Sequence, residues 1–97
     1  MKTQVIKVSA GWCGPCRMYK PIFEEVSKMP DFKDLEFVSL SCDDEKNEKL
    51  IEDELKVKSL PTTIIRDENK KVLGTKVGAM TKATLVKFIN NSLSGEE

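Results

Sequence analysis

The sequence predicts one α/β domain over residues 1–97, with the element order β-α-β-α-β-β-α and a mixed four-stranded sheet flanked by helices. Short runs rich in β-branched residues alternate with segments whose apolar residues recur every three or four positions. The first strand–helix–strand unit requires two parallel strands joined by a right-handed crossover. The polar turn 67–70 between the last two strands predicts an antiparallel hairpin. A chain of 97 residues is enough for one compact domain.

Local signals place the ends of these elements. Proline is tolerated in the first turn of a helix, so Pro15 fits the start of the first one. Asp43 and Asp44 put negative charge where a second helix would begin, and Thr81 is a suitable N-cap for the last. Residues 94–97 are expected to fray. The strands are expected at 5–9, 35–42, 62–65 and 72–77. Each helix is expected to turn one apolar face to the core. The faces consist of Tyr19, Ile22, Phe23 and Val26 in the first helix, of Leu50, Ile51 and Leu55 in the second, and of Leu85, Val86, Ile89 and Leu93 in the last.

The composition argues against several classes of function. Lys plus Arg equals Asp plus Glu at 16 each, so no broad electrostatic attraction to nucleic acid or to an anionic membrane is expected. The N-terminus lacks the continuous apolar run of a signal peptide, and no stretch approaches the roughly 20 apolar residues of a membrane span. Three cysteines are an odd count for a secreted disulfide framework. We therefore expect a monomer in a reducing compartment, the cytoplasm.

Cys13 and Cys16 lie three residues apart at the predicted start of the first helix. At that spacing both side chains share one helix face, with Cβ atoms ~5–6 Å apart, so a small shift makes a disulfide possible. The unpaired N–H groups and roughly half a positive charge at a helix N-terminus stabilise a thiolate. Cys13 is therefore the expected nucleophile of disulfide exchange, and Cys16, one turn deeper, is the expected resolving thiol. Arg17 adds positive charge nearby.

Other interpretations of the cysteines are weaker. Half a zinc site would need more ligands, yet the chain has no histidine and only one other cysteine, Cys42, so no metal is expected. A C-x-x-C beside a βαβ pattern in a cytosolic chain is typical of a redox pair. Cys42 ends a predicted strand and is interpreted as a small buried hydrophobe, with a regulatory thiol as the alternative.

The segment Trp12-Cys13-Gly14-Pro15-Cys16 resembles the active-site motif of the thioredoxin family. Leu60-Pro61-Thr62 resembles the family's cis-proline loop, and Lys76-Val77-Gly78-Ala79 resembles its second substrate-contacting loop. The resemblance runs from Val5 to Leu93. It implies a thioredoxin-like fold, no bound cofactor beyond a redox-active Cys13–Cys16 disulfide, and recharging by a flavin-dependent thioredoxin reductase.

The resemblance also implies a flat apolar surface for protein disulfide substrates, on which a substrate strand would pair beside Pro61. Only ~5–6% of X–Pro bonds in folded proteins are cis, so the sequence alone favours a trans Leu60–Pro61 bond, whereas the resemblance favours cis. For Trp12, core packing is the alternative to a contact role. We call this implied surface the docking surface; its residues are Trp12, Gly14, Pro15, Leu60, Pro61, Val77 and Gly78.

The chain departs from the family pattern at two informative places. Met1 falls where the family's second strand begins, which implies a trimmed fold. The family carries a buried Asp six residues before the first cysteine, where this chain has Lys7. A protonated lysine at ~6 Å attracts a thiolate by on the order of 2–3 kcal/mol at an effective dielectric near 20. Lys7 is therefore predicted to favour the thiolates and make the couple less reducing; the alternative is that its side chain reaches solvent.

The sequence thus predicts a thiol–disulfide oxidoreductase that reduces protein disulfides. One alternative is a glutaredoxin-like enzyme recharged by glutathione, against which stand Gly14-Pro15 between the cysteines and Ala79 after Gly78. A second alternative, from a different class, is a binding subunit that uses the docking surface without turnover, although both cysteines are present.

Overall fold

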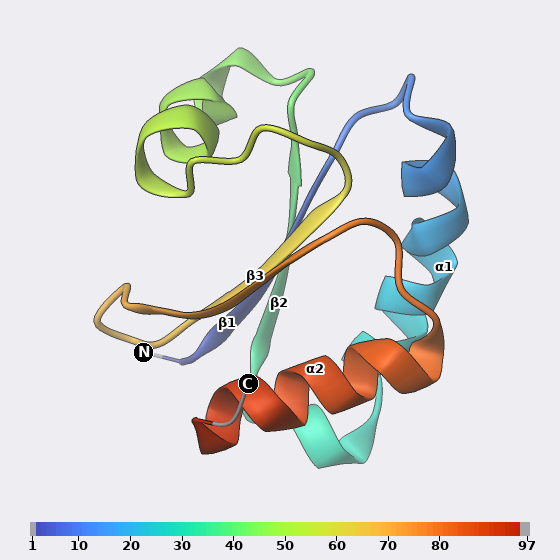
Figure 1. Cartoon of the computed structure of the whole chain (residues 1–97), viewed down its shortest axis with the longest axis vertical. Helices are drawn as coiled ribbons and strands as arrows, with labels where there is room; N and C mark the ends of the chain where they lie inside the picture. Colours follow the sequence, from blue (N-terminus) through green and yellow to red (C-terminus); the bar gives the residue numbers. More distant parts are fainter. Residues whose placement is uncertain (1, 96–97) are drawn as a thin grey trace.

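The structure is a computed structural model that describes residues 2–95, and its strands form one mixed sheet in the order β2-β1-β3-β4 (Figure 1). β1 runs parallel to β2 and antiparallel to β3, and β3 and β4 form an antiparallel pair. The predicted parallel crossover and the predicted hairpin are both confirmed. The strands are β1 Gln4–Ser9, β2 Glu36–Ser41, β3 Thr62–Arg66 and β4 Val72–Val77.

The two long helices, α1 (Gly14–Ser27) and α2 (Lys82–Ser94), cover one face of the sheet (Figure 1). Successive side chains of a strand point to opposite faces, so Val5 of β1 faces these helices while Ile6 and Val8 face away. Burying each such aliphatic side chain stabilises the fold by about 1.5–3 kcal/mol. The core on the helical face contains Val5, Tyr19, Phe23, Val26, Phe32, Ile65, Met80, Leu85 and Ile89.

The opposite face of the sheet is covered by the segment between β2 and β3, where the structure corrects the expected second helix. This segment is helical over residues 45–54 but is not a regular α-helix: it begins with a 3₁₀ turn at Glu45–Asn47 and ends with a π-helical turn at Leu50–Glu54. The amide of Leu55 donates to the carbonyl of Leu50 at 2.9 Å, which widens the turn. Packing explains the wide turn, because it brings both Ile51 and Leu55 against the sheet residues Ile6, Val8 and Ile64.

Other boundary predictions have mixed outcomes. Thr81 caps α2 as predicted, since its hydroxyl accepts a hydrogen bond from the Thr84 amide at 3.2 Å. Leu93 was expected to be buried and is 44% exposed. Ser94 was expected to fray, but it is the last residue of α2, and Gly95 ends the helix with φ +80°, a conformation that suits glycine. Residues 96 and 97 of the predicted tail lie outside the described residues.

The fold positions two elements that matter for function. A loop from Ser9 to Cys13 leads from the end of β1 into α1, and a second loop leads into β3 through Leu60 and Pro61. Within residues 2–95, no helix has the length and apolar character that crossing a bilayer requires.

A buried hydrogen bond links α1 to the central sheet: Tyr19 Oη and Thr63 Oγ1 lie 2.6 Å apart, and both residues are fully buried. Desolvation raises the pKa of the Tyr19 phenol to about 12, an effect that the hydrogen bond to Thr63 partly opposes. Because an ordinary tyrosine titrates near pH 10, the folded state holds this proton more tightly than the unfolded state.

We expect Tyr19→Phe to lower the free energy of unfolding by about 1 kcal/mol near pH 7, because the buried Thr63 hydroxyl loses its partner. The stability supplied by the protonated phenol is present below about pH 10 and is lost as the pH rises from about 10 to about 12. Urea unfolding at about pH 7 and pH 11 should therefore show that the difference in free energy of unfolding between the parent protein and the variant is smaller at the higher pH. A difference in free energy of unfolding that is the same at both pH values would contradict this role of the Tyr19 phenol.

Candidate redox site

Cys13 is the N-cap residue of α1, with an extended backbone, and its Sγ accepts a hydrogen bond from the Cys16 amide at 3.3 Å. Pro15 lies in the first turn, as predicted, and the first turn of α1 contains no acidic residue. The positive end of the helix is therefore not neutralised by a side chain of its own first turn. A sulfur at this position receives both a hydrogen bond and the field of the helix, and both favour the thiolate over the thiol.

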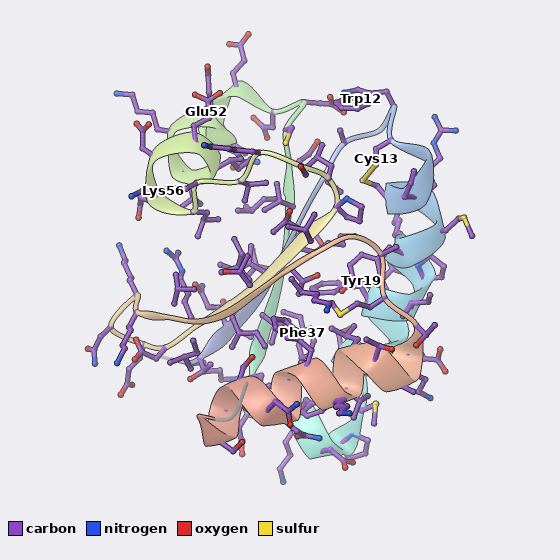
Figure 2. All side chains as sticks on the ribbon, viewed as in Figure 1. Trp12, Cys13, Tyr19, Phe37, Glu52 and Lys56 are labelled. Carbon is purple, nitrogen blue, oxygen red and sulfur yellow. A yellow bond between two sulfur atoms is a disulfide. The ribbon has the colours of Figure 1, made fainter. Side chains whose placement is uncertain are left out.

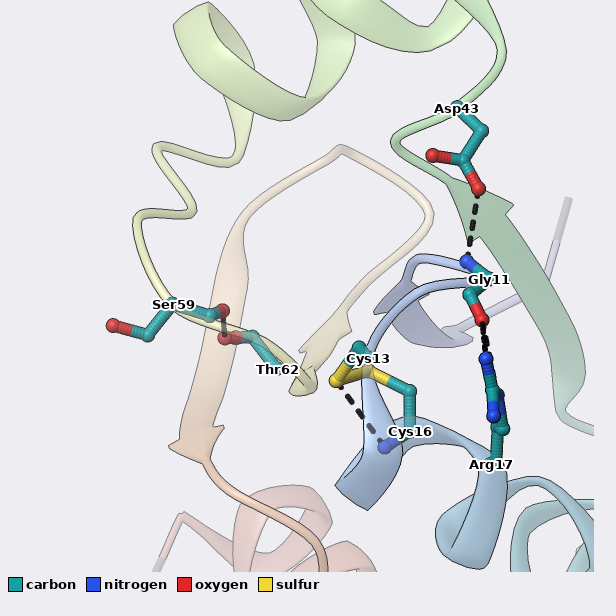
Figure 3. The surroundings of a disulfide bond; sticks show 7 residues. All are labelled: Gly11, Cys13, Cys16, Arg17, Asp43, Ser59 and Thr62. Atoms are coloured by element: carbon teal, nitrogen blue, oxygen red, sulfur yellow. Dashed lines mark hydrogen bonds between the residues drawn. A yellow bond between two sulfur atoms is a disulfide. The ribbon is translucent and has the colours of Figure 1, made fainter.

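Cys13 and Cys16 form a disulfide, with Cα atoms 5.2 Å apart (Figure 3). Both residues are buried, at 6% and 3% exposed, so exposure alone barely distinguishes them. They differ in what they face. Cys13 lines a surface hollow of about 300 Å³ together with Trp12 and Leu60, which we call the outer hollow. Cys16 lines a separate hollow of about 410 Å³ together with Lys7, which we call the inner hollow.

The docking surface expected from the sequence gathers around Cys13. Trp12 is 72% exposed and Val77 is 63% exposed, so Trp12 is not a core residue (Figure 2). The Leu60–Pro61 peptide bond is cis, as the resemblance implied. The Gly78 amide donates to the Pro61 carbonyl at 2.8 Å, and this bond holds the two loops together. Gly78 has φ +100°, which a residue with a side chain rarely adopts.

The same surface is completed by residues close to the disulfide. Leu60 packs against the small cluster formed by Ala10 and the two cysteines. Gly14 and Pro15, at the start of α1, are exposed on the outside of the helix. The structure therefore brings the predicted surface residues to one end of the sheet, on both sides of Cys13.

The loop before Cys13 is held by two contacts that sequence reasoning missed. The Gly11 amide donates to Asp43 Oδ2 at 2.8 Å, and the Gly11 carbonyl accepts from Arg17 Nε at 3.0 Å and Nη2 at 2.8 Å (Figure 3). Arg17 was assigned only an electrostatic role, and Asp43 was expected to start a helix; the N-cap of that turn is Asp44. A Cβ at position 11 would lie 3.2 Å from Asp43, so a side chain there would crowd this contact.

Lys7 is buried as a residue, at 4% exposed, but its Nζ is not a fully enclosed atom, so the alternative in which the amine reaches solvent stays compatible with the structure. It sits in the middle of β1, opposite Ser39 of β2 and Thr63 of β3. Its Nζ lies 5.2 Å from the centroid of the Phe23 ring. Desolvation lowers the pKa of Lys7, while the Glu24 carboxylate acts to raise it and the Lys20 ammonium acts to lower it.

Cys42 is exposed, so its interpretation as a buried hydrophobe is wrong. β2 ends one residue earlier than predicted, at Ser41, which leaves Cys42 in the turn that follows, where it contributes to the wall of the outer hollow. Partial desolvation, and then the carboxylates of Asp43 and Glu52, raise the pKa of the Cys42 thiol. The chain therefore places a poorly ionised thiol near the active pair.

The Cys13–Cys16 disulfide is the redox group of the described residues, and within residues 2–95 no group of three or more His, Cys, Asp or Glu is arranged to hold a metal ion. A dithiol pair at the N-terminus of a helix, beside a cis-proline loop and on a mixed sheet of this topology, defines the class of thiol–disulfide oxidoreductases.

Comparison with known proteins identifies the family. The Thioredoxin family model matches residues 1–91. The chain is 36% identical to a thioredoxin of Mycoplasmoides gallisepticum over 91% of its length and 82% of that protein. It is 34% identical to a thioredoxin of Haemophilus influenzae over 87% of its length and 74% of that protein. The chain belongs to the thioredoxin family, and its activity is thiol–disulfide exchange.

Solved structures agree with this assignment. The thioredoxin of Malassezia sympodialis superimposes with a TM-score of 0.76 at 30% identity, covering 94% of this chain and 76% of that one. Thioredoxin f from spinach chloroplast gives a TM-score of 0.78 at 29% identity, covering 95% of this chain and 77% of the other. The predicted thioredoxin-like fold is thereby confirmed.

Proposed function

We propose that this protein reduces protein disulfides, with Cys13 as the attacking thiolate and Cys16 as the resolving thiol. The observation that carries this assignment is the difference in what the two sulfurs face. Cys13 is the N-cap and lines the outer hollow among docking-surface residues, whereas Cys16 faces the inner hollow. A substrate disulfide that approaches over Trp12 would meet Cys13 first.

The reaction proceeds in two exchanges. The Cys13 thiolate attacks one sulfur of the substrate disulfide, forms a mixed disulfide and releases the other substrate sulfur as a thiolate. Cys16 loses its proton and attacks Cys13 Sγ, which forms the Cys13–Cys16 disulfide and releases the second substrate thiolate. Two electrons pass from the dithiol to the substrate, and both released thiolates take up protons.

The docking surface supplies the partner contacts in this proposal. Exposed Trp12 and Val77 offer apolar area at the two sides of Cys13. An extended substrate segment would pair as an added strand with the backbone at Leu60, next to the cis bond. Recharging then requires an electron donor, for which we propose a flavin-dependent thioredoxin reductase using NADPH, in the reducing environment of the cytoplasm.

Turnover separates this function from its two alternatives. We expect the parent protein to reduce insulin disulfides with NADPH and a thioredoxin reductase, and to do so poorly when glutathione and its reductase replace that system. Cys13→Ser should abolish turnover, because the attacking thiolate is gone. Cys16→Ser should abolish turnover but accumulate a mixed disulfide at Cys13, measurable by intact mass.

The matched control is Cys42→Ser, which should keep full turnover because Cys42 is outside the exchanging pair. Preferential recharging by glutathione would support the glutaredoxin-like alternative. A partner-dependent activity that survives in the double variant Cys13→Ser, Cys16→Ser would support the non-catalytic binding subunit.

We further propose that Lys7 makes the Cys13–Cys16 couple less reducing, since a cation near Cys16 favours the thiolate of the reduced form. Lys7→Asp reverses the sign of that charge, so the redox midpoint should become more negative by roughly 30 mV or more, where about 30 mV corresponds to 1.4 kcal/mol for two electrons. Titration against a glutathione or dithiothreitol buffer measures the midpoint. Lys20→Asp, which makes the same change at an exposed position, is the control; an unchanged or less negative midpoint in Lys7→Asp contradicts the proposal.

A further inference from the structure

The outer side of β2 has no partner strand within residues 2–95, because the sheet order places β2 and β4 at the two edges. The hydrogen bonds from β2 to the β1 side begin with the amide of Glu36 and end with that of Cys42. Successive residues of a strand direct their backbone groups to opposite sides, so Phe37, Ser39 and Ser41 point theirs away from β1. An edge of this kind is a template for a further strand.

The two edges of the sheet differ in their protection against such pairing. β4 carries Lys76, follows Lys71, and pairs with β3 through a register shift at Ile65 and Arg66. Lysines and bulges are devices by which proteins keep edge strands from pairing. β2 has no lysine, proline or register shift, and its one charged residue, Glu36, stands at its first position. β2 is therefore the edge that is open to a partner.

The backbone of β2 is complementary to itself in an antiparallel pairing centred on Val38. In this register Phe37 of one copy lies opposite Ser39 of the other, and the two residues exchange both of their backbone hydrogen bonds. The backbone groups of Phe37 and Ser39 that this pairing uses have no partner within residues 2–95. The centre of the strand can therefore be fully paired by a second β2.

The ends of the same register also fit, because Leu35 of one copy lies opposite Ser41 of the other. The Leu35 amide already donates to the Phe32 carbonyl at 3.0 Å, and the Ser41 carbonyl already accepts from the Asp44 amide at 3.3 Å and from Asn47 Nδ2 at 3.2 Å. The two groups that are left, the Leu35 carbonyl and the Ser41 amide, face each other across the pairing.

The side chains of β2 meet without repulsion in this register. Val38 lies opposite Val38 of the second copy on the sheet face away from α1, and cross-strand pairs of β-branched residues stabilise a sheet. Glu36 lies opposite Leu40 of the other copy, so no two like charges are brought directly together.

The charges of α1 beside β2 favour the same arrangement. The inner hollow is lined by residues of β2 and by Arg17, Lys20 and Glu24 of α1. The two-fold axis of the pairing makes the two α1 helices antiparallel to each other. The basic part of this row in one copy is then directed toward the acidic part in the other, which is complementary.

We propose that the outer edge of β2 binds β2 of a second copy of this chain, antiparallel about Val38, so that the two sheets become one continuous sheet. The contact is two-fold symmetric and closed, so it gives a dimer and no longer assembly. This dimer replaces the monomer expected from the sequence. Since β2 has 6 residues, whereas a standard interface uses roughly 20–30 residues a side, the dimer is expected to be weak.

The pairing leaves both redox sites open. Cys13 follows the C-terminal end of β1, and β1 is parallel to β2. An antiparallel pairing of two β2 strands therefore places the two Cys13 residues at opposite ends of the continuous sheet. The dimer adds an interaction surface that is separate from the docking surface, and it does not depend on the proposed function.

Sedimentation velocity tests the pairing in a Cys42→Ser background, which excludes intermolecular disulfides through the exposed thiol. The mass should rise from 10.9 kDa at about 10 µM toward twice that value at about 1 mM. Val38→Lys brings two ammonium groups together at the centre of the interface, and Val38→Glu brings two carboxylates together. Each variant alone should raise the dissociation constant at least tenfold, and an equimolar mixture should restore association because lysine then faces glutamate.

The matched control is Thr75→Lys, which adds the same charge at an exposed position of β4. It should change the dissociation constant by less than about twofold, because β4 lies outside the interface. Should the Val38 variants fail to fold, amide hydrogen exchange in the background protein decides. The Phe37 and Ser39 amides should exchange more slowly at about 1 mM than at about 10 µM, while the Thr75 amide should not change.

A mass that stays at 10.9 kDa at about 1 mM would overturn the proposal. So would a Val38→Lys protein that associates like the background protein, or a mixture of the two Val38 variants that stays monomeric. Phe37 and Ser39 amides that are equally protected at both concentrations would show that another segment of the same chain covers the edge, which also overturns it.

Insulin reduction in the same samples separates this inference from the proposed function. A protein that is monomeric but active would reject the dimer and leave the proposed function in place. A protein that is dimeric but inactive would reject the proposed function and leave the dimer in place.

Discussion

The chemistry of this chain depends on the electrostatic field at the N-terminus of α1. A helix begins with amide groups that have no intrahelical acceptor, and together with the aligned peptide dipoles they make that end positive. Cys13 occupies the N-cap, where side chains usually accept hydrogen bonds from these amides, and its sulfur does so from Cys16. The rest of the site keeps this sulfur in place: Asp43 and Arg17 hold the Gly11 peptide, and the cis Leu60–Pro61 loop packs beside it.

The two cysteines of the disulfide face two different environments. On the side of Cys13 lies the exposed apolar side chain of Trp12, beside the hollow that Leu60 also lines. On the side of Cys16 lies a hollow lined by Lys7 and by the serines Ser9, Ser39 and Ser41. Burial of most of the Lys7 side chain has a cost, because partial desolvation disfavours its charged form and lowers its pKa.

Much of the fold could be predicted because its signals are local. The strand–helix–strand unit, the hairpin and the Thr81 cap each follow from residues within a few positions of one another. The segment 45–54 could not be predicted as a π-helical turn, because its geometry is decided by the packing of Ile51 and Leu55 on distant strands. For the same reason the exposure of Cys42 depended on where β2 ends, a boundary that the sequence leaves uncertain by a residue or two.

The candidate site, like the fold, could be predicted where its signals are local in sequence and could not be predicted where they are not. The cysteine pair and the surrounding apolar surface were readable from three short motifs. The hydrogen bond between Gly11 and Asp43 could not be predicted from the sequence. Asp43 lies 32 residues away, and only the parallel pairing of β1 with β2 brings it close. The burial of Lys7 could not be predicted either, because a lysine in a strand can either extend to solvent or remain under a helix.

The most direct test of the central claim is the pH dependence of iodoacetamide alkylation in the reduced protein, read for each cysteine by mass spectrometry. Cys42 in the same molecule and a cysteine in an unstructured peptide serve as references, the latter with only a few per cent thiolate near pH 7. If the helix N-terminus stabilises the Cys13 thiolate, Cys13 should react at least tenfold faster than either reference near pH 7, with Cys42 the slowest because the pKa of its thiol is raised. Equal rates for Cys13 and the peptide would contradict the account.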